Sequence, residues 1–377
     1  MSYRPKTKLG ILGGGQLGRM LIQETINLDV DVHVLDPDEN APCRDIAHEF
    51  THGSFKDFDT VMQFGKDKDV LTIEIEHVNV DALDALEKQG IKVYPQPNVI
   101  RMIQDKGAQK AFYDSHDIPT SEYRLIGENE AKNHVDFLPV FQKLRTGGYD
   151  GRGVQSLKTE SDLEKAFPEA SVLEKAVDLE KELSVIVSRN TKGEIATFPT
   201  VELEFNPVAN LVEFLFSPAD VSDEVEKTAQ DLAKKVAEKL EIVGLLAVEL
   251  FLDKQGNVLV NEIAPRPHNS GHQSIEGNYT SQFMQHLRSV LDLTLGNTEI
   301  VKPSVMVNLL GEDGHTGEAK YEGLEDVLAM KGVNVHLYGK RLTKPFRKMG
   351  HVTVIADTLN EAKTIAKSVQ QTLKVIA

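Results

Sequence analysis

The chain has 377 residues, with 58 acidic against 42 basic side chains and a net charge of -16. This length predicts two or three domains, and the acidic balance argues against nucleic acid as the main partner. A single cysteine, Cys43, excludes an internal disulfide and a multi-cysteine zinc site, so we interpret it as structural. No uncharged apolar run is long enough to cross a membrane, and no apolar signal region precedes Leu9, so we expect a cytoplasmic protein.

The N-terminal segment alternates strands and helices. A strand at 8–12 leads into Gly13-Gly14-Gly15-Gln16-Leu17-Gly18 and a helix, and a second strand ends at Asp36. This order matches a dinucleotide fingerprint, which makes a nicotinamide enzyme one hypothesis. In the alternative, the glycines allow close packing of helix on strand and hold another phosphate. Further strands at 70–75 and 91–94, around a helix at 80–89, predict an open parallel sheet with Glu74 and Glu76 at its ligand-binding end.

A glycine-rich segment follows the predicted helix 106–113. The strand 140–143 ends on Lys143, and residues 146–153 read TGGYDGRG, whose backbone N–H groups could cover phosphates. No Walker motif occurs, and a flexible surface turn is the alternative. Strands predicted at 172–177, 181–187, 201–205 and 211–216, with a helix at 223–240, complete this part of the chain.

Two carboxylates interrupt the apolar strands of a predicted hairpin. The strand 245–252 carries Glu249, and Asn261 and Glu262 follow the strand 258–260. A turn centred between Gln255 and Gly256 would place Glu249 directly across from Glu262. Opposed carboxylates repel each other, and a divalent cation such as Mg²⁺ relieves the repulsion. The alternative is that both side chains face solvent at a sheet edge.

Polar side chains continue beyond this hairpin, where two prolines and Gly271 prevent regular structure. His268 and His272 are four apart, but without a helix or a third soft ligand we do not favour zinc, and His272 can be structural. After a helix at 282–291, strands at 305–309, 333–338 and 351–355 and a last helix from about 360 predict a small β-rich domain. Its basic cluster, which is either a solvated face or a phosphate site, comprises Lys340, Arg341, Lys344, Arg347 and Lys348.

In its order of parts, the chain resembles the ATP-grasp carboligases, and closely the family of N5-carboxyaminoimidazole ribonucleotide synthases. The resemblance covers essentially the whole chain and rests on GGGQLGRM (13–20), EIEHV (74–78), GGYDGRG (147–153) and NEIAPRPHNSGH (261–272). It implies a mixed α/β (α+β) ATP-grasp fold. The implied domains are an N-terminal Rossmann-like domain at 1–105, an ATP-grasp domain at 106–298 with a lid at about 113–178, and a C-terminal β-rich domain at 299–377.

The resemblance implies an ATP-dependent ligase of purine biosynthesis. ATP, bicarbonate and 5-aminoimidazole ribonucleotide would give N5-carboxyaminoimidazole ribonucleotide, ADP and phosphate through carboxyphosphate, with Mg²⁺ or Mn²⁺ and without biotin or NAD. The protein would be a cytoplasmic homodimer whose partners are small molecules rather than nucleic acid or membrane, and its product would pass to the N5-carboxyaminoimidazole ribonucleotide mutase. The glycine turn at 13–18 would then face the ribonucleotide.

The resemblance also assigns roles to residues. ATP would contact Lys106, Lys143, Gly148, Tyr149, Asp150, Gly151, Arg152, Gly153, Val154, Glu174, Lys175, Ala176, Val177, Glu182, Asn261 and Glu262. The metal would bind Glu249 and Glu262. Catalysis and bicarbonate binding would use Arg266, His268, Asn269, Asp150 and Arg152. The ribonucleotide would contact Gln16, Leu17, Glu76, Tyr149, Lys340 and Arg347.

Two positions depart from the family pattern. Phe205 stands where the family often has a histidine, and Val154 stands where many relatives have glutamine, so no side-chain role is transferred to either. Three alternatives remain open: another ATP-grasp ligase, such as a formate-using purine enzyme or a biotin carboxylase; a nicotinamide oxidoreductase; and a catalytically silent nucleotide sensor. The HNSGH and YGK sequences favour the ribonucleotide carboxylase, and the Glu249–Glu262 pair argues against the sensor.

Overall fold

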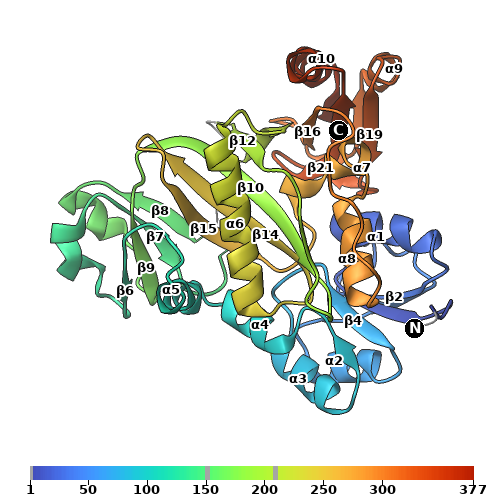
Figure 1. Ribbon diagram of the computed structural model, residues 1–377, viewed down its shortest axis with the longest axis horizontal. Helices are drawn as coiled ribbons and strands as arrows, with labels where there is room; N and C mark the ends of the chain where they lie inside the picture. The colour runs from blue at the N-terminus through green and yellow to red at the C-terminus, as the bar shows by residue number, and fades with distance from the viewer. Residues whose placement is uncertain (1–2, 149–152, 207–210) are drawn as a thin grey trace.

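The N-terminal part is a five-stranded parallel sheet with helices on both faces (Figure 1). The computed structural model describes residues 3–148, 153–206 and 211–377. The strand order is β3-β2-β1-β4-β5, as predicted for an open parallel sheet. Its strands are β1 (Lys8–Leu12), β2 (Asp31–Asp36), β3 (Glu49–His52), β4 (Val70–Ile73) and β5 (Lys92–Val93), and its helices are α1 (Gln16–Ile26), α2 (Phe58–Gly65), α3 (Val80–Lys88) and α4 (Pro97–Ile103).

A smaller antiparallel sheet forms the lid, and α5 (Lys106–Ser115) leads into it. Its order is β6-β9-β7-β8, and its core packs around the buried Phe137 and Leu173. The lid elements are β6 (Tyr123–Ile126), β7 (Val140–Leu144), β8 (Val154–Leu157) and β9 (Ser171–Lys175), with 3-10 turns η1 (Ala131–Phe137) and η2 (Glu160–Lys165). In Figure 1 the lid stands apart on the left, joined to the remainder through α5 and the link from β9 to β10.

The largest sheet has nine strands and unites two predicted domains. Its order is β15-β14-β10-β12-β13-β16-β21-β19, with β11 beside β10. The central strands are β10 (Leu179–Arg189), β11 (Ile195–Thr197), β12 (Val201–Phe205), β13 (Val212–Ser217), β14 (Gly244–Asp253) and β15 (Val258–Ala264). Helix α6 (Asp223–Leu240) crosses one face (Figure 1), and its Leu232 and Val236 share a core with Val185 and Leu246. We predicted that β15 ends near Val260, but it continues to Ala264, so the polar residues lie on the strand itself.

The C-terminal strands continue this sheet, because β13 pairs with β16. The elements after β15 are η3 (Asn269–Gly271), α7 (Ser274–Gly277), α8 (Gln282–Val290), β16 (Ser304–Leu310), β17 (Gly317–Glu318), β18 (Lys320–Glu322), α9 (Leu324–Leu328), β19 (Val333–Leu337), β20 (Leu342–Thr343), β21 (Lys348–Ile355), α10 (Leu359–Thr372) and β22 (Lys374–Ile376). Helix α8 packs Phe283 and Leu287 into one core with Leu17 and Leu21 of α1. Within the described ranges, no helix combines the length and apolar character needed to cross a membrane.

Candidate functional site

The carboxylates of the hairpin face each other across β14 and β15. Glu249 pairs with Glu262, as predicted, but the register shifts beside this pair, because Leu250 pairs with Val260. Asn261 is therefore the extra residue of a β-bulge. The bulge places Asn261 and Glu262 on the face of the sheet that carries Glu249, while Val260 stays in the core.

Two lysines reach this face from outside the large sheet. Lys106, the first residue of α5, forms an ion pair with Glu262, and Lys143 at the end of β7 donates to Asn261 Oδ1 at 2.9 Å. Lys143 also donates to Glu174 of β9 at 3.0 Å. The predicted ATP-binding lysines thus meet the predicted metal-binding strand, at the junction of the lid and the large sheet.

A fully enclosed ion pair lies beneath Lys143. Lys110 Nζ lies 3.3 Å from Glu174 Oε1, and the two side chains are 2% and 5% exposed. Thr120 and Ser121 accept hydrogen bonds from the same ammonium at 2.6 and 3.3 Å. Burial lowers the pKa of Lys110 to about 8. Burial alone would raise the pKa of Glu174, but Lys143 and Lys110 outweigh it and hold that pKa below its ordinary value.

The electrostatics of the carboxylates fit a divalent cation. Burial, followed by the charges of Glu262 and Glu182, raises the pKa of Glu249, whereas Lys106 lowers the pKa of Glu262. Glu182 of β10 lies two residues before Ser184, which pairs with Glu249, so three carboxylates share one face. Among the residues that the structure describes, no group of three or more His, Cys, Asp or Glu side chains has metal-ligand geometry. Carboxylate oxygens are hard donors of the kind that divalent cations such as Mg²⁺ prefer, and two of them face each other here.

The residues after β15 add a guanidinium, from Arg266, and an imidazole, from His268, to this site. Arg266 forms an ion pair with Glu76, which follows β4, at 2.8 Å. His268 Nε2 lies 3.4 Å from Glu249 Oε1, and its Nδ1 accepts from the backbone N–H of Ser270 at 3.4 Å. With Nδ1 turned toward Ser270, Nε2 is the ring nitrogen that faces Glu249.

Asn269 is fixed by the first strand of the C-terminal part. Its Nδ2 donates to Asn308 Oδ1 at 2.9 Å, and Asn308 Nδ2 donates back to Asn269 Oδ1 at 3.0 Å. Asn308 Nδ2 also donates to the carbonyl oxygen of Val212 at 2.8 Å. The orientation of Asn269 therefore depends on the continuity between β13 and β16.

The glycine turn before α1 is filled by a carboxylate of the chain. Glu74 Oε2 accepts from Gly15 N–H at 2.6 Å and Glu74 Oε1 from Leu17 N–H at 3.2 Å, while Asp36 accepts from Gly14 N–H at 2.6 Å. These N–H groups would hold the pyrophosphate in a dinucleotide-binding domain. Since they are already paired, the geometry disfavours the nicotinamide hypothesis.

The glycine-rich segment is described only at its base. Gly147 and Gly153 have φ of +80° and +74°, a conformation that favours glycine, and Leu144 N–H donates to Gly153 O at 2.8 Å. Gly148 lies at the same base, and Val154 opens β8 opposite Lys143. The predicted roles of Tyr149, Asp150, Gly151 and Arg152 lie outside the described residues.

The predicted adenine segment, 174–177, links β9 of the lid to β10 of the large sheet. The carboxylate of Glu174 points to the buried lysine pair, and Lys175 Nζ lies over the ring of Phe137 at 4.6 Å from its centroid. Ala176 is exposed and Val177 half-buried. The predicted contacts to adenine from this link would therefore come from its backbone and the two small side chains.

The predicted ribonucleotide residues come from the two ends of the chain. Tyr338 shares a core with Leu17, and a Cβ at Gly339 would lie 3.3 Å from Arg19, so the turn carrying Lys340 packs on α1 near Gln16. Lys340 Nζ donates to Lys348 O at 2.7 Å. Arg347 donates to Leu342 O at 2.7 Å and belongs to the same C-terminal loop. The structure thus packs the turn that carries Lys340 against α1, the helix that follows the glycine turn.

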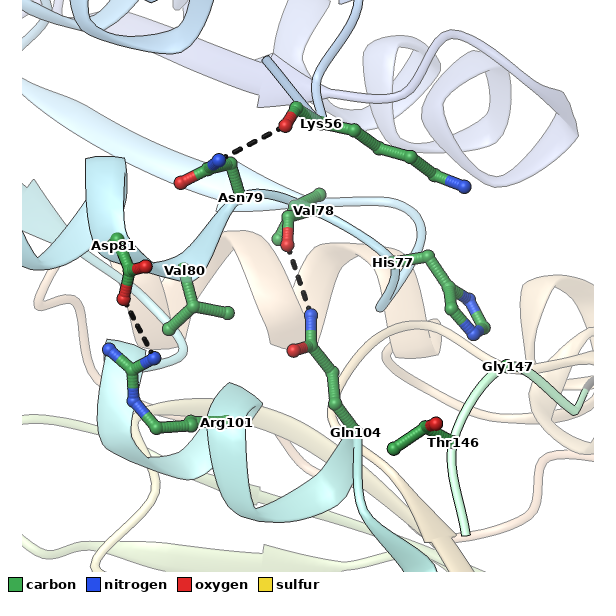
Figure 2. A pocket seen from close by; sticks show the side chains of 10 residues that line it. All are labelled: Lys56, His77, Val78, Asn79, Val80, Asp81, Arg101, Gln104, Thr146 and Gly147. Atoms are coloured by element: carbon green, nitrogen blue, oxygen red, sulfur yellow. Dashed lines mark hydrogen bonds and ion pairs between the residues drawn. The ribbon is translucent and has the colours of Figure 1, made fainter. Parts of the chain in front are cut away.

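An open hollow of about 400 Å³ borders this centre without containing the carboxylate pair. Figure 2 shows His77 and Thr146 on one side of it, near the base of the glycine-rich segment, and the Asp81–Arg101 pair on the other. In its middle, Gln104 donates to the carbonyl oxygens of Glu76 and Val78 at 2.7 and 3.0 Å. Gln104 thereby fixes the residue that pairs with Arg266.

Sequence reasoning missed several residues of this centre. Lys110 lies four residues after Lys106, a spacing that places both on one helix face and could have indicated it. Gln104, Gln282 and Asn308 hold the functional segments from other elements, and no local pattern marks them.

Comparisons with known proteins agree with this organisation. The ATP-grasp domain model matches residues 111–283, the ribonucleotide synthetase preATP-grasp domain matches 6–104, and the phosphoribosylaminoimidazole carboxylase C-terminal domain matches 304–364. A chloroplastic phosphoribosylaminoimidazole carboxylase of Vigna aconitifolia is 39% identical over 94% of this chain, which spans 65% of that longer protein.

Full-length similarity is found with shorter relatives. The N5-carboxyaminoimidazole ribonucleotide synthase of Bacillus subtilis (strain 168) is 37% identical, covering 95% of this chain and 93% of the relative. The crystal structure of N5-carboxyaminoimidazole ribonucleotide synthetase from Thermotoga maritima has a TM-score of 0.91 and 43% identity, covering 98% and 99% of the two chains. That of the Aspergillus clavatus synthase with ADP and 5-aminoimidazole ribonucleotide has a TM-score of 0.88 and 35% identity, covering 97% and 98%. The chain therefore belongs to the family of N5-carboxyaminoimidazole ribonucleotide synthases, ATP-dependent ligases of the ATP-grasp superfamily that act in purine biosynthesis.

Proposed function

We propose that this chain uses ATP and bicarbonate to carboxylate 5-aminoimidazole ribonucleotide on its exocyclic amine, releasing ADP and phosphate. A bicarbonate oxygen attacks the γ-phosphorus of ATP, and ADP leaves. The amine then takes the carboxyl group from carboxyphosphate, or from CO₂ released by it, and phosphate leaves. The observation that carries this proposal is the convergence of Lys106, Lys143, Glu249 and Glu262 with Arg266 and His268 at one junction.

Phosphoryl transfer needs positioned charge more than a protein nucleophile. Lys106 and Lys143 hold the phosphates of ATP, and family resemblance assigns the segment from Gly148 to Val154 to the same phosphates. Glu174, Lys175, Ala176 and Val177 frame the adenine, and Glu182 binds the ribose. The pairing of Lys143 with Glu174 and Asn261 supports this, because it ties the lid to the metal-binding strand.

Glu249 and Glu262 would hold Mg²⁺, or Mn²⁺ in its place, with Asn261 beside them. The cation would neutralise charge on the phosphates. The support for this assignment is that the two carboxylates face each other across β14 and β15 and that the pKa of Glu249 is raised. Lys106 offsets part of the same negative charge from the side of α5.

The bicarbonate site is assigned to Arg266, His268 and Asn269. The Arg266 guanidinium offers a charge-assisted contact to an anion, and His268 turns Nε2 toward Glu249. Asp150 and Arg152 are assigned to the same step by family resemblance. The ribonucleotide is assigned to Gln16, Leu17, Glu76, Tyr149, Lys340 and Arg347. The packing of the Lys340 turn on α1 supports this set.

The reaction is tested by measuring ADP release from the purified protein with ATP, Mg²⁺ and bicarbonate, with and without 5-aminoimidazole ribonucleotide. Release that depends on bicarbonate and is strongly stimulated by the ribonucleotide is expected. Release that is indifferent to the ribonucleotide would contradict the proposed acceptor and favour another ATP-grasp ligase. An absence of ADP release, with ATP still bound, would favour the sensor.

The proposal also includes domain limits at 105/106 and 298/299 and a homodimer. We further propose that the protein acts in the cytoplasm and delivers its product to the N5-carboxyaminoimidazole ribonucleotide mutase. Family resemblance supports them, and the two limits fall in the gaps between the matched domain models, 104–111 and 283–304. Light scattering at several protein concentrations tests the dimer. A coupled assay with the mutase tests the delivery.

A further inference from the structure

One side chain of α8 holds, by hydrogen bonds, the segment 266–272, which carries the residues assigned to bicarbonate. Gln282, the first residue of α8, has no exposed surface. Its Oε1 accepts from His268 N–H at 2.9 Å, and its Nε2 donates to His268 O at 2.7 Å and to His272 Nδ1 at 3.0 Å. Both donors of the amide and its oxygen are therefore satisfied, which fixes the orientation of the amide group.

The hydrogen bonds from Gln282 fix the backbone of His268, from which the imidazole projects. The amide holds His268 on both sides of its Cα, and Ser270 holds its Nδ1, so the ring has little freedom to turn away from Glu249. Ser270 is itself linked to Ser184 of β10 by hydroxyl groups 2.8 Å apart. The placement of His268 is thus decided by α8 and β10, outside the segment itself.

Gly271 provides a second, independent observation. A Cβ at Gly271 would lie 2.5 Å from Gln282 Oε1 and 2.6 Å from Gln282 Cδ. Gly271 is absent from the glycines with positive φ, so space for the amide, and not backbone freedom, requires a glycine here. The segment and the Gln282 side chain are therefore shaped to each other.

We propose that Gln282 is a positioning residue for carboxylation: it holds His268 in the orientation that the bicarbonate step needs. This inference rests on the proposed function, because it takes Arg266, His268 and Asn269 as the bicarbonate site. A displacement of a reacting group by about 1 Å can reduce a rate on the order of a hundredfold. Loss of the Gln282 hydrogen bonds should therefore reduce the rate of carboxylation measurably.

The chain offers a matched control on the same helix. Gln285 is also fully buried, and its amide holds one residue in the same way, donating to Gly296 O at 2.9 Å and accepting from Gly296 N–H at 2.8 Å. Gln285→Leu removes two hydrogen bonds of the same kind without touching the bicarbonate segment. The comparison of Gln282→Leu with Gln285→Leu separates positioning from stability.

The experiment measures KM for bicarbonate, KM for ATP, and the carboxylated product formed per ADP released. We expect Gln282→Leu to raise the bicarbonate KM, or to lower the product per ADP, by roughly tenfold or more, with the ATP KM within about twofold. Gln285→Leu should lower Tm without changing either quantity.

Gly271→Ala supplies a second route to the same displacement, because its methyl group must push the Gln282 amide aside. It should reproduce the bicarbonate defect, and it decides the question if Gln282→Leu does not fold. Equal kinetic behaviour of Gln282→Leu and Gln285→Leu, or a normal bicarbonate KM and product yield in Gly271→Ala, would overturn the proposal. Failure of the proposed function would be distinguished from this, since the unmodified protein would then form no product.

Discussion

Glu249 and Glu262 face each other because Asn261 is bulged out of the ladder between β14 and β15. If the register near the turn continued unchanged, Asn261 would lie opposite Glu249, and Glu262 would lie opposite Val248 on the buried face. The bulge instead places an amide and a carboxylate side by side on the site face. There they contact Lys143 and Lys106, respectively.

Replacing Glu262 by Gln removes one of the two facing carboxylates. We expect a folded protein that has lost bicarbonate-dependent ADP formation, because the metal would lose a charged ligand and Lys106 its partner. ADP release and thermal unfolding check this. Glu204→Gln, which changes an exposed carboxylate on β12 of the same sheet, should leave activity unchanged. Normal activity of Glu262→Gln would refute the metal assignment.

The buried Lys110–Glu174 pair predicts an effect on stability. Glu174→Gln leaves two lysines without their carboxylate, and breaking a buried ion pair in this way costs about 3–5 kcal/mol. Urea-induced unfolding measures the loss. The exposed Lys254–Asp178 pair, with N and O atoms 2.7 Å apart, is the control, and Asp178→Asn should cost far less because solvent screens this pair. Similar midpoints for the two variants would contradict the prediction.

The lowered pKa of Lys110 predicts that the stability of the protein depends on pH. Burial holds the pKa of Lys110 at about 8 in the folded chain, below its ordinary 10.5. The unfolded chain therefore binds more protons between these values, so the stability associated with neutral Lys110 is full above about pH 10.5 and is lost as pH falls through 8. Lys110→Met lacks this titration. The Tm of the unmodified protein should rise relative to that of Lys110→Met between about pH 8 and 10.5, and a constant difference would show that Lys110 has no lowered pKa.

Lys340 is predicted to contribute to binding of the ribonucleotide and not of ATP. Its turn packs on α1 beside the glycine turn, so Lys340→Ala should raise the KM of the ribonucleotide far more than that of ATP. Steady-state kinetics with each substrate varied in turn measures the two values. Lys344→Ala removes an exposed lysine of the same basic cluster and should change neither. An unchanged ribonucleotide KM in Lys340→Ala would exclude Lys340 from the site.

Regular patterns made much of the fold predictable. The periodic helix 223–240 and the strand 201–205 have the predicted bounds, because their apolar spacing and flanking residues act locally. The pairing of Glu249 with Glu262 was also predicted, although from a uniform register. The bulge at Asn261 was not, since it depends on contacts with Lys143 and Lys106 from distant elements.

Long-range relationships account for what the sequence did not reveal. Strands β13 and β16 are separated by α6, the hairpin and α8, so nothing local indicates that the C-terminal strands extend the large sheet. Buried polar groups such as Lys110, Gln282 and Asn308 resemble surface residues in a sequence. Only their partners, which come from other elements, distinguish them.

The glycine turn filled by Glu74 also bears on how this protein avoids wrong ligands. Glu74 is part of the same chain, so its carboxylate competes intramolecularly for the Gly15 and Leu17 N–H groups. NAD and similar dinucleotides would have to displace the Glu74 carboxylate, which is covalently part of the chain. The filled turn therefore works against any ligand whose pyrophosphate would need these N–H groups.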